Sequence, residues 1–337
     1  MREKVLVTGG AGFIGSHLVR FWLKEDPSVV IVNLDKLAYS GDLSRLEEVK
    51  SHPRYEFYKG DVCEPRDVEE AIKGCSTVVH LAAETHVDRS LLNGEVFFQT
   101  NTIGTYCLLE AARKAGVQKF LLVSTDEVYG SRKTGFFKEM DRLSPTSPYS
   151  VSKTAADLLT LSYAHTYGLH TMVTRGSNTF GPYQYPEKVI PLFTAKALSD
   201  EKLPLYGDGR QVRNWIDVED HCRAILHVLK KGKKGEAYNV STPFYLTNLE
   251  LARRILRILG KPVSLIQRVK DRPGHDRRYA LSSRKLRALG WRERFRFEES
   301  LRRTVRWYRE NKAWWKAIKE KSAEFKEYYA KAYAGRV

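Results

Sequence analysis

A glycine-rich segment near the start of the chain constrains the fold more than any other feature. Residues 9–15 read GGAGFIG, directly after the apolar run Val5–Thr8 and at the start of a helical pattern over Phe13–Lys24. Small residues at such a turn let the backbone approach a ligand, and the helix N-terminus offers free N–H groups and partial positive charge. The segment therefore predicts a first strand–helix unit with an anionic group held at the turn.

The first half of the chain alternates short apolar runs with longer helical patterns. The runs that read as strands are Val5–Thr8, Val29–Leu34, Tyr55–Tyr58, Thr77–Leu81, Phe120–Ser124 and Thr171–Arg175. The helical patterns between them are Phe13–Lys24, Val68–Lys73, Gly104–Ala115 and Ser150–Tyr167. This alternation predicts an α/β fold, a Rossmann-type doubly wound parallel sheet with helices on both faces.

A carboxylate at the end of the second run indicates which dinucleotide the turn would hold. Asp35 follows Gly15 by 20 residues, where it can accept hydrogen bonds from both ribose hydroxyls of an adenosine. Because it would repel a 2′-phosphate, NAD is favoured over NADP, although Lys36 next to it weakens that preference slightly. Asp61, after the third run, fits either a position beside the adenine or a simple turn.

The pattern loosens after about Gly181, where Pro and Gly become frequent. A helix near Val218–Leu229 and a strand near Ala237–Val240 are expected to return to the sheet. The expected division is an NAD-binding domain of residues 1–184 plus about 214–242, a smaller mixed α/β substrate lobe of about 185–213 and 243–310, and a basic tail of 311–337. A helical stretch is expected from Leu301 to about Tyr333.

The net charge of +17 has two interpretations. Residues 300–337 contain 11 Lys and Arg against 4 Glu, and residues 264–296 are also rich in Arg. Such charge can attract an anionic ligand or nucleic acid, or it can be a solvated helix face. Because Lys and Glu interleave and no nucleic-acid motif is present, the second interpretation is favoured. In the tail, Trp307, Trp314 and Trp315 fit a helix packing face better than a binding site.

Other bulk features indicate a cytoplasmic protein. The four cysteines, Cys63, Cys75, Cys107 and Cys222, have no paired spacing for a metal or a disulfide framework, and the nine His form no ligand cluster. No apolar run approaches the roughly 18 residues of a membrane span, and no charged-then-apolar leader opens the chain. We therefore expect no metal and no membrane partner.

A tyrosine and a lysine four residues apart suit redox chemistry at a hydroxyl. Tyr149 and Lys153 share one face of a helix, separated by one turn. A lysine and a positive nicotinamide can favour the phenolate, whose ordinary pKa is about 10. Most such pairs lie on helix surfaces, but this pair follows the strand ending at Ser124 in a chain with the glycine segment. We expect Thr125 to hydrogen-bond the oxygen of that same substrate hydroxyl.

Two adjacent acids follow that strand. Asp126 and Glu127 could be an ordinary solvated turn. Their position after Phe120–Ser124 instead predicts that they lie at the carboxyl edge of the sheet, where ligands bind. Adjacent carboxylates push each other's pKa values apart, so one can be a proton donor while the other is an acceptor.

Together these motifs resemble those of the extended short-chain dehydrogenase/reductases. The triplet Thr125-Asp126-Glu127 and the segments 82–90 (AAETHVDRS) and 271–279 (DRPGHDRRY) are similar to those of the dTDP-glucose 4,6-dehydratases within that superfamily. The resemblance covers about residues 3–310. It implies a homodimer in which the helices Gly104–Ala115 and Tyr149–Tyr167 pair across a twofold axis, and a tightly bound, recycled NAD.

The resemblance also implies site residues. The catalytic residues it implies are Thr125, Asp126, Glu127, Tyr149 and Lys153. The NAD contacts it implies are Gly9, Gly12, Phe13, Ile14, Gly15, Asp35, Lys36, Asp61, Val62, Leu81, Ala82, Ala83, Tyr149 and Lys153. The nucleotide-sugar contacts it implies are Thr85, His86, Asn178, Glu187, Lys188, Tyr206, Arg213, Asn248, Arg272 and His275.

The chain departs from the usual pattern of that family at several positions. Thr179-Phe180 stands in place of Asn-Tyr, Asn214 in place of Asp, Asp42 in place of Asn, and Thr85 in place of Ser. These changes leave the chemistry untouched but leave open the nucleotide base, dTDP or UDP.

The expected activity is oxidation at carbon 4 of the sugar, loss of water across carbons 5 and 6, and reduction at carbon 6 with the same NAD. A nucleotide-sugar 4-epimerase or decarboxylase on the same scaffold is the nearest alternative, but it has no use for Asp126 and Glu127. A non-catalytic NAD-binding protein acting through a basic surface, for example on RNA, is a second alternative. It has no need of the full catalytic set, so a nucleic-acid partner is not expected.

Overall fold

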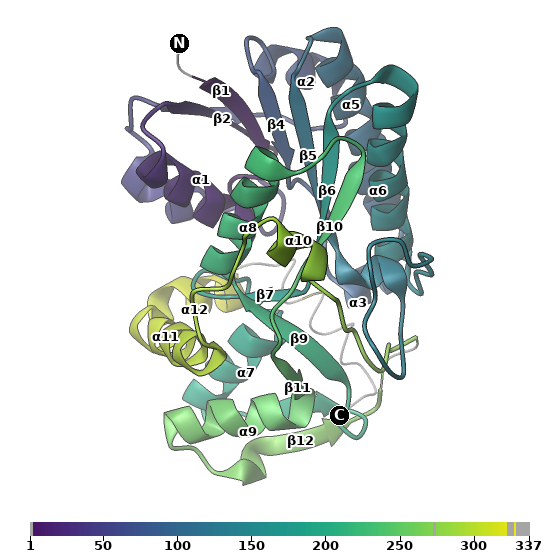
Figure 1. Ribbon diagram of the computed structural model, residues 1–337. Coiled ribbons are helices and arrows are strands. Elements are labelled where there is room, and N and C mark those ends of the chain that lie inside the picture. Colours follow the sequence, from purple (N-terminus) through teal and green to yellow (C-terminus); the bar gives the residue numbers. More distant parts are fainter. Residues whose placement is uncertain (1–2, 272–273, 322–326, 328–337) are drawn as a thin grey trace.

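The computed structural model describes residues 3–271, 274–321 and 327, which form two lobes (Figure 1). A seven-stranded parallel sheet is the centre of the larger lobe. Its strands run in the order β10 (Glu236–Val240), β6 (Thr171–Gly176), β5 (Lys119–Thr125), β4 (Thr77–His80), β1 (Glu3–Thr8), β2 (Val29–Asp35) and β3 (Tyr55–Lys59). The order reverses between β1 and β4, where the carboxyl ends of the strands leave a crevice for a ligand. The predicted Rossmann-type sheet is confirmed.

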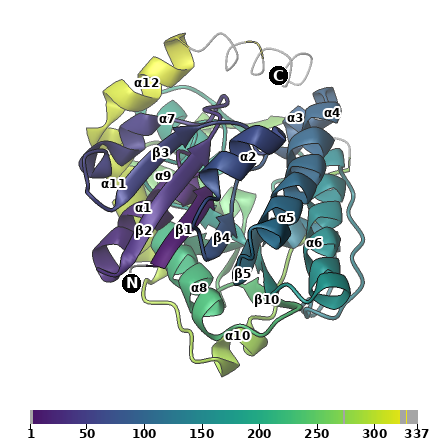
Figure 2. The same cartoon turned by 90° about the horizontal axis from the view of Figure 1, so that it is seen from above.

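Two layers of helices cover the sheet, which explains why its strands are continuously apolar. Helices α1 (Phe13–Glu25) and α8 (Val218–Lys231) pack on one face, and α2 (Pro65–Ala71), α5 (Gly104–Lys114) and α6 (Pro148–Tyr167) pack on the other (Figures 1 and 2). The expected return of the later helix and strand to this sheet, as α8 and β10, is also confirmed.

The smaller lobe contains short, mixed strands. One sheet has the order β11 (Tyr245–Thr247), β9 (Val212–Asp217) and β7 (Asn178–Phe180), and a second pairs β12 (Ile266–Val269) with β8 (Leu203–Tyr206). Helices α7 (Val189–Leu198), α9 (Asn248–Leu259) and α11 (Phe297–Glu310) enclose a separate apolar core with these strands. A mixed α/β lobe was predicted, but its individual strands were not.

Shorter elements complete the described chain. They are η1 (Leu43–Val49), α3 (Val87–Leu92), α4 (Glu95–Phe97), the π-helical segment η2 (Phe98–Ile103), η3 (Asp126–Tyr129), η4 (Val263–Leu265), α10 (Arg284–Ala288) and α12 (Lys312–Lys321).

The tail was predicted as one helical stretch from Leu301, but the structure has two helices there. α11 ends at Glu310, the next residue Asn311 has φ −108° and ψ 42°, and α12 begins at Lys312. Trp315 is 1% exposed, and Trp307 and Trp314 pack beside it, so the predicted packing role of these rings is confirmed. The part of the tail expected to continue to Tyr333 lies outside the described residues, Glu327 excepted.

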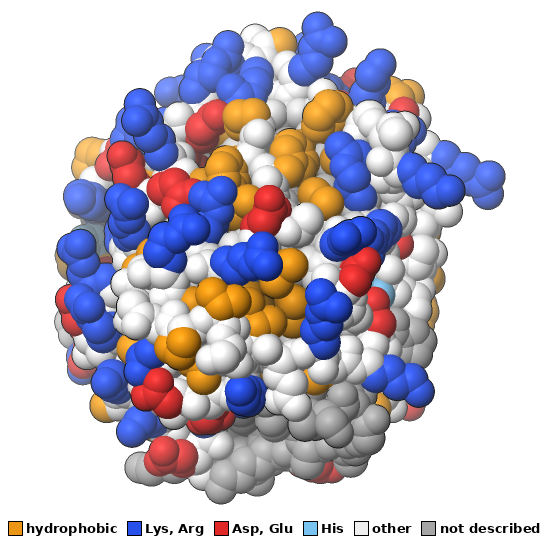
Figure 3. All heavy atoms as spheres, turned by 90° about the horizontal axis from the view of Figure 1, so that it is seen from below, with side chains coloured by type: hydrophobic (Ala, Val, Ile, Leu, Met, Phe, Trp, Pro, Cys, Tyr) orange, Lys and Arg blue, Asp and Glu red, His pale blue; other side chains and the backbone are white. Residues whose placement is uncertain are grey.

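Two surface properties bear on partners. On the face seen from below, Lys and Arg side chains are spread widely, with Asp and Glu between them (Figure 3). This distribution fits a solvated basic surface. In the described ranges, no helix has both the length and the apolar character needed to span a membrane.

Candidate active site

The glycine segment forms a tight turn between β1 and α1. Gly9 has φ +73°, a conformation that side chains rarely adopt, and a Cβ on Gly15 would lie 2.1 Å from the Gly9 carbonyl oxygen. The Gly12 N–H donates to that same oxygen at 3.1 Å, and α1 begins at the next residue. The tight turn therefore requires these glycines, and α1 begins directly beside it with free N–H groups that can bind an anionic group.

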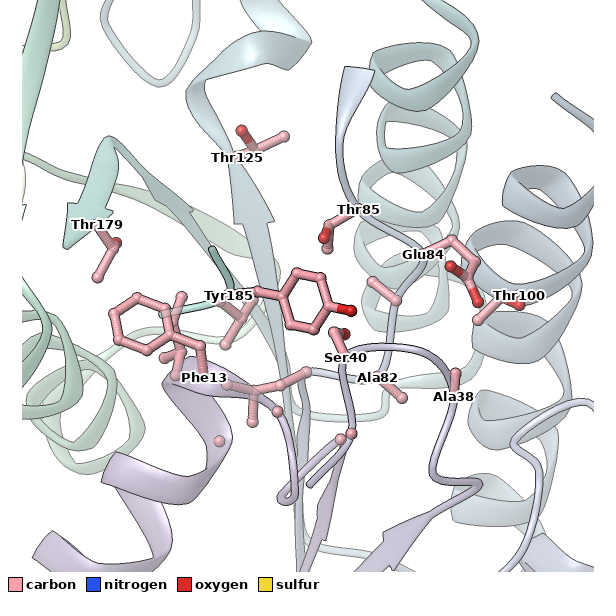
Figure 4. Close-up of a pocket in the computed structure, with 18 of the residues that line it drawn as sticks. Phe13, Ala38, Ser40, Ala82, Glu84, Thr85, Thr100, Thr125, Thr179 and Tyr185 are labelled. Atoms are coloured by element: carbon pink, nitrogen blue, oxygen red, sulfur yellow. The ribbon is translucent and has the colours of Figure 1, made fainter. Parts of the chain in front are cut away.

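This turn borders a cavity of about 290 Å³ at the carboxyl ends of the strands. Every residue predicted to contact NAD and every predicted catalytic residue lines it. In the close-up, Phe13 and Tyr185 extend into the cavity, Glu84 and Thr100 lie at one end, and Thr125 and Thr179 lie toward the other (Figure 4). The turn and the two polar motifs thus share one cavity.

Asp35 lies at the end of β2, as predicted. Its carboxylate accepts from the Ala11 N–H at 2.9 Å and the Leu37 N–H at 2.8 Å, and burial raises its pKa. Lys36 next to it donates to Thr100 Oγ1 at 3.2 Å and lies 3.6 Å from Asp61 and 3.7 Å from Glu84. The positive charge beside Asp35 is therefore surrounded by acids, which favours an adenosine without a 2′-phosphate.

Helix α6 presents the redox pair because of how it begins. Ser147 and Ser150 cap each other reciprocally, and Pro148 occupies the first turn, so Tyr149 and Lys153 lie one turn apart at the cavity. Lys153 Nζ donates to the Val123 carbonyl oxygen at 2.9 Å, and burial lowers the pKa of Lys153 to about 8.

The pKa of Tyr149 is raised, first by burial and then by the charge of Glu127, while a hydrogen bond from Thr125 lowers it. This direction is opposite to the expected lowering.

The two acids occupy η3, immediately after β5. Asp126 is 3% exposed, and burial together with the charge of Glu127 raises its pKa to about 8. Thr125 Oγ1 donates to Asp126 Oδ1 at 3.3 Å and accepts from the Glu127 N–H at 3.3 Å. Asp126 therefore carries a proton at neutral pH, and the main physical cause is its burial.

A buried ion pair holds η3 against α6. Arg175 on β6 donates to both carboxylate oxygens of Asp157 at 2.8 Å, and their side chains are 3% and 0% exposed. The same guanidinium donates at 2.7 Å to the hydroxyl of Tyr129, whose proton goes to Asn239 Oδ1 at 2.8 Å. Because Tyr129 is in η3 and Asp157 is one turn after Lys153, this network fixes the acids relative to the redox pair.

Four of the predicted sugar contacts also line the cavity, namely Thr85, Asn178, Glu187 and Lys188. Glu187 is paired with Arg89 at 2.9 Å and accepts from the Tyr39 hydroxyl at 3.0 Å. Arg89 also lies over the Tyr39 ring, 3.9 Å from its centroid.

The other predicted sugar contacts do not line this cavity. Tyr206 donates to Asp88 at 2.9 Å and meets the His275 ring edge to face, and His275 pairs with Asp271 at 2.6 Å. His86 precedes α3, Asn248 begins α9, and Arg213 lies in β9 with its guanidinium over the Tyr279 ring. Arg272 lies outside the described residues.

The structure adds cavity residues that sequence reasoning did not find. Tyr39, Arg45, Ser177, Tyr185 and His221 all line it. Tyr39 and Arg45 follow the strand that ends at Asp35 closely, so their position in the sequence could have indicated a place near the cavity. Ser177, Tyr185 and His221 belong to no motif that would have indicated this. Among the described residues, no group of three or more His, Cys, Asp or Glu is arranged to hold a metal ion.

The sequence is similar to known sugar-nucleotide enzymes over nearly all of its length. The sequence model for GDP-mannose 4,6 dehydratase matches residues 6–304. A dTDP-glucose 4,6-dehydratase of Streptomyces niveus is 46% identical, covering 94% of this chain and 96% of its own. The low-salt glycan biosynthesis protein Agl12 of Haloferax volcanii is 47% identical, with coverages of 90% and 98%.

Solved structures share the fold. The dTDP-glucose 4,6-dehydratase DesIV of Streptomyces venezuelae, with NAD and dTDP bound, has a TM-score of 0.92 and 46% identity, covering 94% of this chain and 99% of its own. The UDP-glucose 4-epimerase of Thermus thermophilus with NAD has a TM-score of 0.85 and 32% identity, with coverages of 91% and 99%.

Proposed function

The chain belongs to the GDP-mannose 4,6 dehydratase family, and we propose that it is an NAD-dependent hydro-lyase that converts dTDP-glucose to dTDP-4-keto-6-deoxyglucose. The observation that carries this proposal is the state of Asp126. A buried acid with a pKa of about 8 lies next to Glu127 in the same cavity as Tyr149 and Lys153. An epimerase needs only the redox pair, whereas elimination of water needs both a proton donor and a proton acceptor.

The cavity residues fit NAD. Gly9 and Gly15 let the turn pack against neighbouring backbone at the edge of the cavity, because a Cβ on either would clash there, and Asp35 can accept from ribose hydroxyls. Ser124 Oγ, Ser177 Oγ and His221 Nε2 are buried without a hydrogen-bond partner in the described protein, as expected of groups that face a polar ligand. These residues would hold NAD, which would supply the hydride acceptor for oxidation at carbon 4 of the sugar and the hydride for reduction at carbon 6.

The protein's own residues would then move the protons. Tyr149 removes the proton of the 4-hydroxyl while Thr125 orients that oxygen. Burial is the main cause of the raised pKa of Tyr149. The positive charge of a bound nicotinamide would act in the opposite direction and favour the Tyr149 phenolate. With a ketone at carbon 4, Glu127 removes the proton from carbon 5. Asp126, protonated at neutral pH, delivers its proton to the departing 6-hydroxyl.

We propose that the nucleotide end of the substrate extends from the cavity toward Tyr206, Arg213, Asn248 and His275. Arg213 is close enough to Asp126 for its charge to lower the pKa of that acid. The substrate would thus bridge the NAD-binding domain, 1–184 plus about 214–242, and the smaller lobe, about 185–213 and 243–310.

We also propose a homodimer formed by α5 and α6. The outer surface of these helices exposes Tyr106, Val151, Leu158 and Tyr167, of which Leu158 is 54% exposed. An apolar surface of this kind typically marks a protein interface. Sedimentation should give twice the chain mass, and Leu158→Glu should shift it toward the monomer.

A cytoplasmic location is proposed from the thiols. Cys63, Cys75, Cys107 and Cys222 are all free cysteines, as is usual in a reducing compartment. Fractionation of the source cells with an antibody to the protein tests this directly.

The activity can be tested with purified protein and no added cofactor. Incubation with dTDP-glucose should yield a product lighter by one water, and UDP-glucose should react more slowly. Release of NAD by denaturation should show that it co-purified and was not consumed. A product of unchanged mass would indicate epimerisation and contradict the proposal.

A further inference from the structure

Helix α12 lies between the smaller lobe and a loop of the cofactor cavity. Trp315 is buried beside Ala195 of α7, and its indole N–H donates to the Tyr308 carbonyl oxygen at 2.8 Å. Lys319 lies 3.4 Å from Glu201, just beyond α7. These contacts dock α12 against the smaller lobe and fix where the neighbouring Trp314 can reach.

Trp314 contacts the segment that follows β2. Its indole N–H donates to Asp42 Oδ2 at 2.9 Å, and its ring lies under the Arg45 guanidinium, 5.5 Å from Cζ to centroid. Arg45 is 1% exposed and lines the cofactor cavity together with Ala38, Ser40 and Gly41. The segment of residues 38–45, here called the cavity loop, is thus joined to α12 through Trp314.

The cavity loop is in turn bonded to the glycine turn. The Asp42 N–H donates to the Ala11 carbonyl oxygen at 3.0 Å, and Arg45 donates to the same oxygen at 2.8 Å. Arg45 also donates to the Ser40 carbonyl oxygen. Ala11 itself donates to Asp35 at 2.9 Å. One chain of contacts therefore runs from α12 through Asp42 and Arg45 to the turn and to Asp35.

We propose that Trp314 is a positioning residue for the cofactor: by bonding Asp42 and stacking on Arg45, it holds the cavity loop closed over the adenosine end and slows release of NAD. This inference rests on the proposed function, because it assumes that NAD occupies the cavity. It concerns only how long the dinucleotide stays there.

The carboxylate at position 42 is needed for this link. Asp42 Oδ1 accepts from the Ser44 N–H at 2.9 Å and caps η1, while Oδ2 accepts from Trp314. The two bonds use different carboxylate oxygens, and an asparagine in this position would place an NH2 donor where one of those oxygens accepts. Asp42 stands where the resemblance leads one to expect Asn, and Trp314 lies in the tail for which it supplied no counterpart.

Retention has a consequence for catalysis. Because the reaction returns its hydride to the sugar, cofactor lost in the reduced state leaves an enzyme that cannot finish the cycle. A loop held closed from outside keeps the dinucleotide bound through both hydride transfers.

The test is exchange of the bound cofactor. Wild type and Trp314→Phe are loaded with labelled NAD and chased with excess unlabelled NAD, and the retained label is followed by gel filtration. Phe keeps a ring over Arg45 but removes the N–H, so exchange should be about tenfold faster. Affinity for ADP-ribose should fall by a similar factor, whereas affinity for dTDP should not change. Trp307→Phe is the matched control, because Trp307 packs in the same aromatic cluster against Tyr183.

A double-mutant cycle separates the proposed link from general loosening. Asp42→Asn retains a good helix cap and should also exchange NAD about tenfold faster. The double variant with Trp314→Phe should be no faster than either single variant, since both remove the same bond. Multiplying effects, or equal exchange in wild type and Trp314→Phe, would overturn the inference and leave the proposed function intact. Wild type that binds no NAD at all would remove both.

Discussion

Two parts of the candidate site differ in how they are assembled. The catalytic corner, defined as Thr125, Asp126, Glu127, Tyr149 and Lys153, comes from one strand end and one helix that pack directly together. The small-lobe edge, defined as Tyr206, Arg213, Asn248 and His275, comes from β8, β9, α9 and a loop. All members of the corner line the cofactor cavity, whereas no member of the edge does.

The difference shows what short spacing can specify. In the corner, helical periodicity places Lys153 one turn from Tyr149, and the end of β5 places the acids at the sheet's carboxyl edge. Buried polar bonds through Arg175 then make this geometry rigid. At the edge, side chains meet only when the lobe folds, so their positions depend on many distant contacts. We therefore expect substitutions in the corner to have the larger and more separable effects.

The largest expected effect is at the redox pair. Tyr149→Phe removes the proton acceptor for the first step and should reduce turnover by about 10²–10⁴-fold. Glu127→Gln should instead permit oxidation and block elimination, so that absorbance of the reduced nicotinamide accumulates on addition of dTDP-glucose. Stopped-flow absorbance and product mass measure both.

Tyr163→Phe provides the control for Tyr149→Phe. Tyr163 is buried in the same helix, but its hydroxyl bonds Glu110, so its loss should leave turnover close to that of wild type. If Glu127→Gln accumulated no reduced nicotinamide although it folded, the division of roles within the corner would be wrong.

The next effect concerns the rigidity of the corner. Arg175→Met leaves Asp157 as an uncompensated buried charge and removes the donor to Tyr129. Breaking a buried ion pair in this way costs about 3–5 kcal/mol of unfolding free energy. Denaturant unfolding should show this loss, while Arg210→Met, at an exposed position, should change stability by less than about 0.5 kcal/mol. Equal stabilities would mean that the network does not fix the corner.

A smaller, graded effect is expected with pH. Asp126 must be protonated to donate, and its pKa of about 8 means that elimination should slow as pH rises through 8, about tenfold per unit thereafter. Because the charge of Glu127 contributes to this raised pKa, Glu127→Gln should lower it. The pH dependence of single-turnover elimination in wild type measures the first point, and carboxyl titration by NMR in Glu127→Gln measures the second.

The same carboxyl affects stability with a definite sign. Its folded pKa lies above the ordinary value of about 3.9, so the folded state binds the extra proton between about pH 4 and 8. The stability that this proton provides is present in full below pH 4 and is lost as pH rises through 8. Asp126→Asn should abolish this component. An unchanged pH dependence of unfolding in that variant would contradict the assigned pKa.

The fold was predictable where burial on both faces makes strands continuously apolar. β1, β2 and β5 were predicted to within one or two residues at each end for this reason. β7 and β9 were not, because polar residues such as Asn178, Arg213 and Asn214 interrupt any apolar pattern in them. α2 begins at Pro65 rather than Val68, since proline suits the first turn of a helix.

The candidate site was likewise predictable only where a local sequence pattern specifies the position of a residue. The glycine turn, Asp35 and the catalytic corner could be predicted because each depends on local spacing along a strand or helix. Tyr39 and Tyr185 both line the cavity, with their ring centroids 5.3 Å apart, and they come from loops that are far apart in the chain. Their meeting depends on tertiary packing, which leaves no periodic signal in the sequence.

The smallest expected effect is at the small-lobe edge, and it tests whether the edge binds ligand at all. Arg213 is buried, donates to the carbonyl oxygens of Val212 and Asp276 at 2.9 Å, and lies 4.3 Å above the Tyr279 ring. These contacts alone would give it a structural role. A role in binding the diphosphate requires its planar donor fork, which lysine cannot reproduce.

Arg213→Lys should therefore weaken binding of dTDP by roughly fivefold to tenfold, as for loss of one charge-assisted hydrogen bond. NAD occupancy should not change, because the glycine turn lies in the other lobe. Calorimetric titration with dTDP alone avoids any effect on the reacting sugar, and Arg210→Lys at an exposed position controls for a general effect of replacing Arg by Lys. If Arg213→Lys lowered the thermal stability but bound dTDP as tightly as wild type, Arg213 would be a structural residue. Other side chains of the smaller lobe would then have to bind the diphosphate, and the sequence would have predicted the small-lobe edge even less well than the catalytic corner.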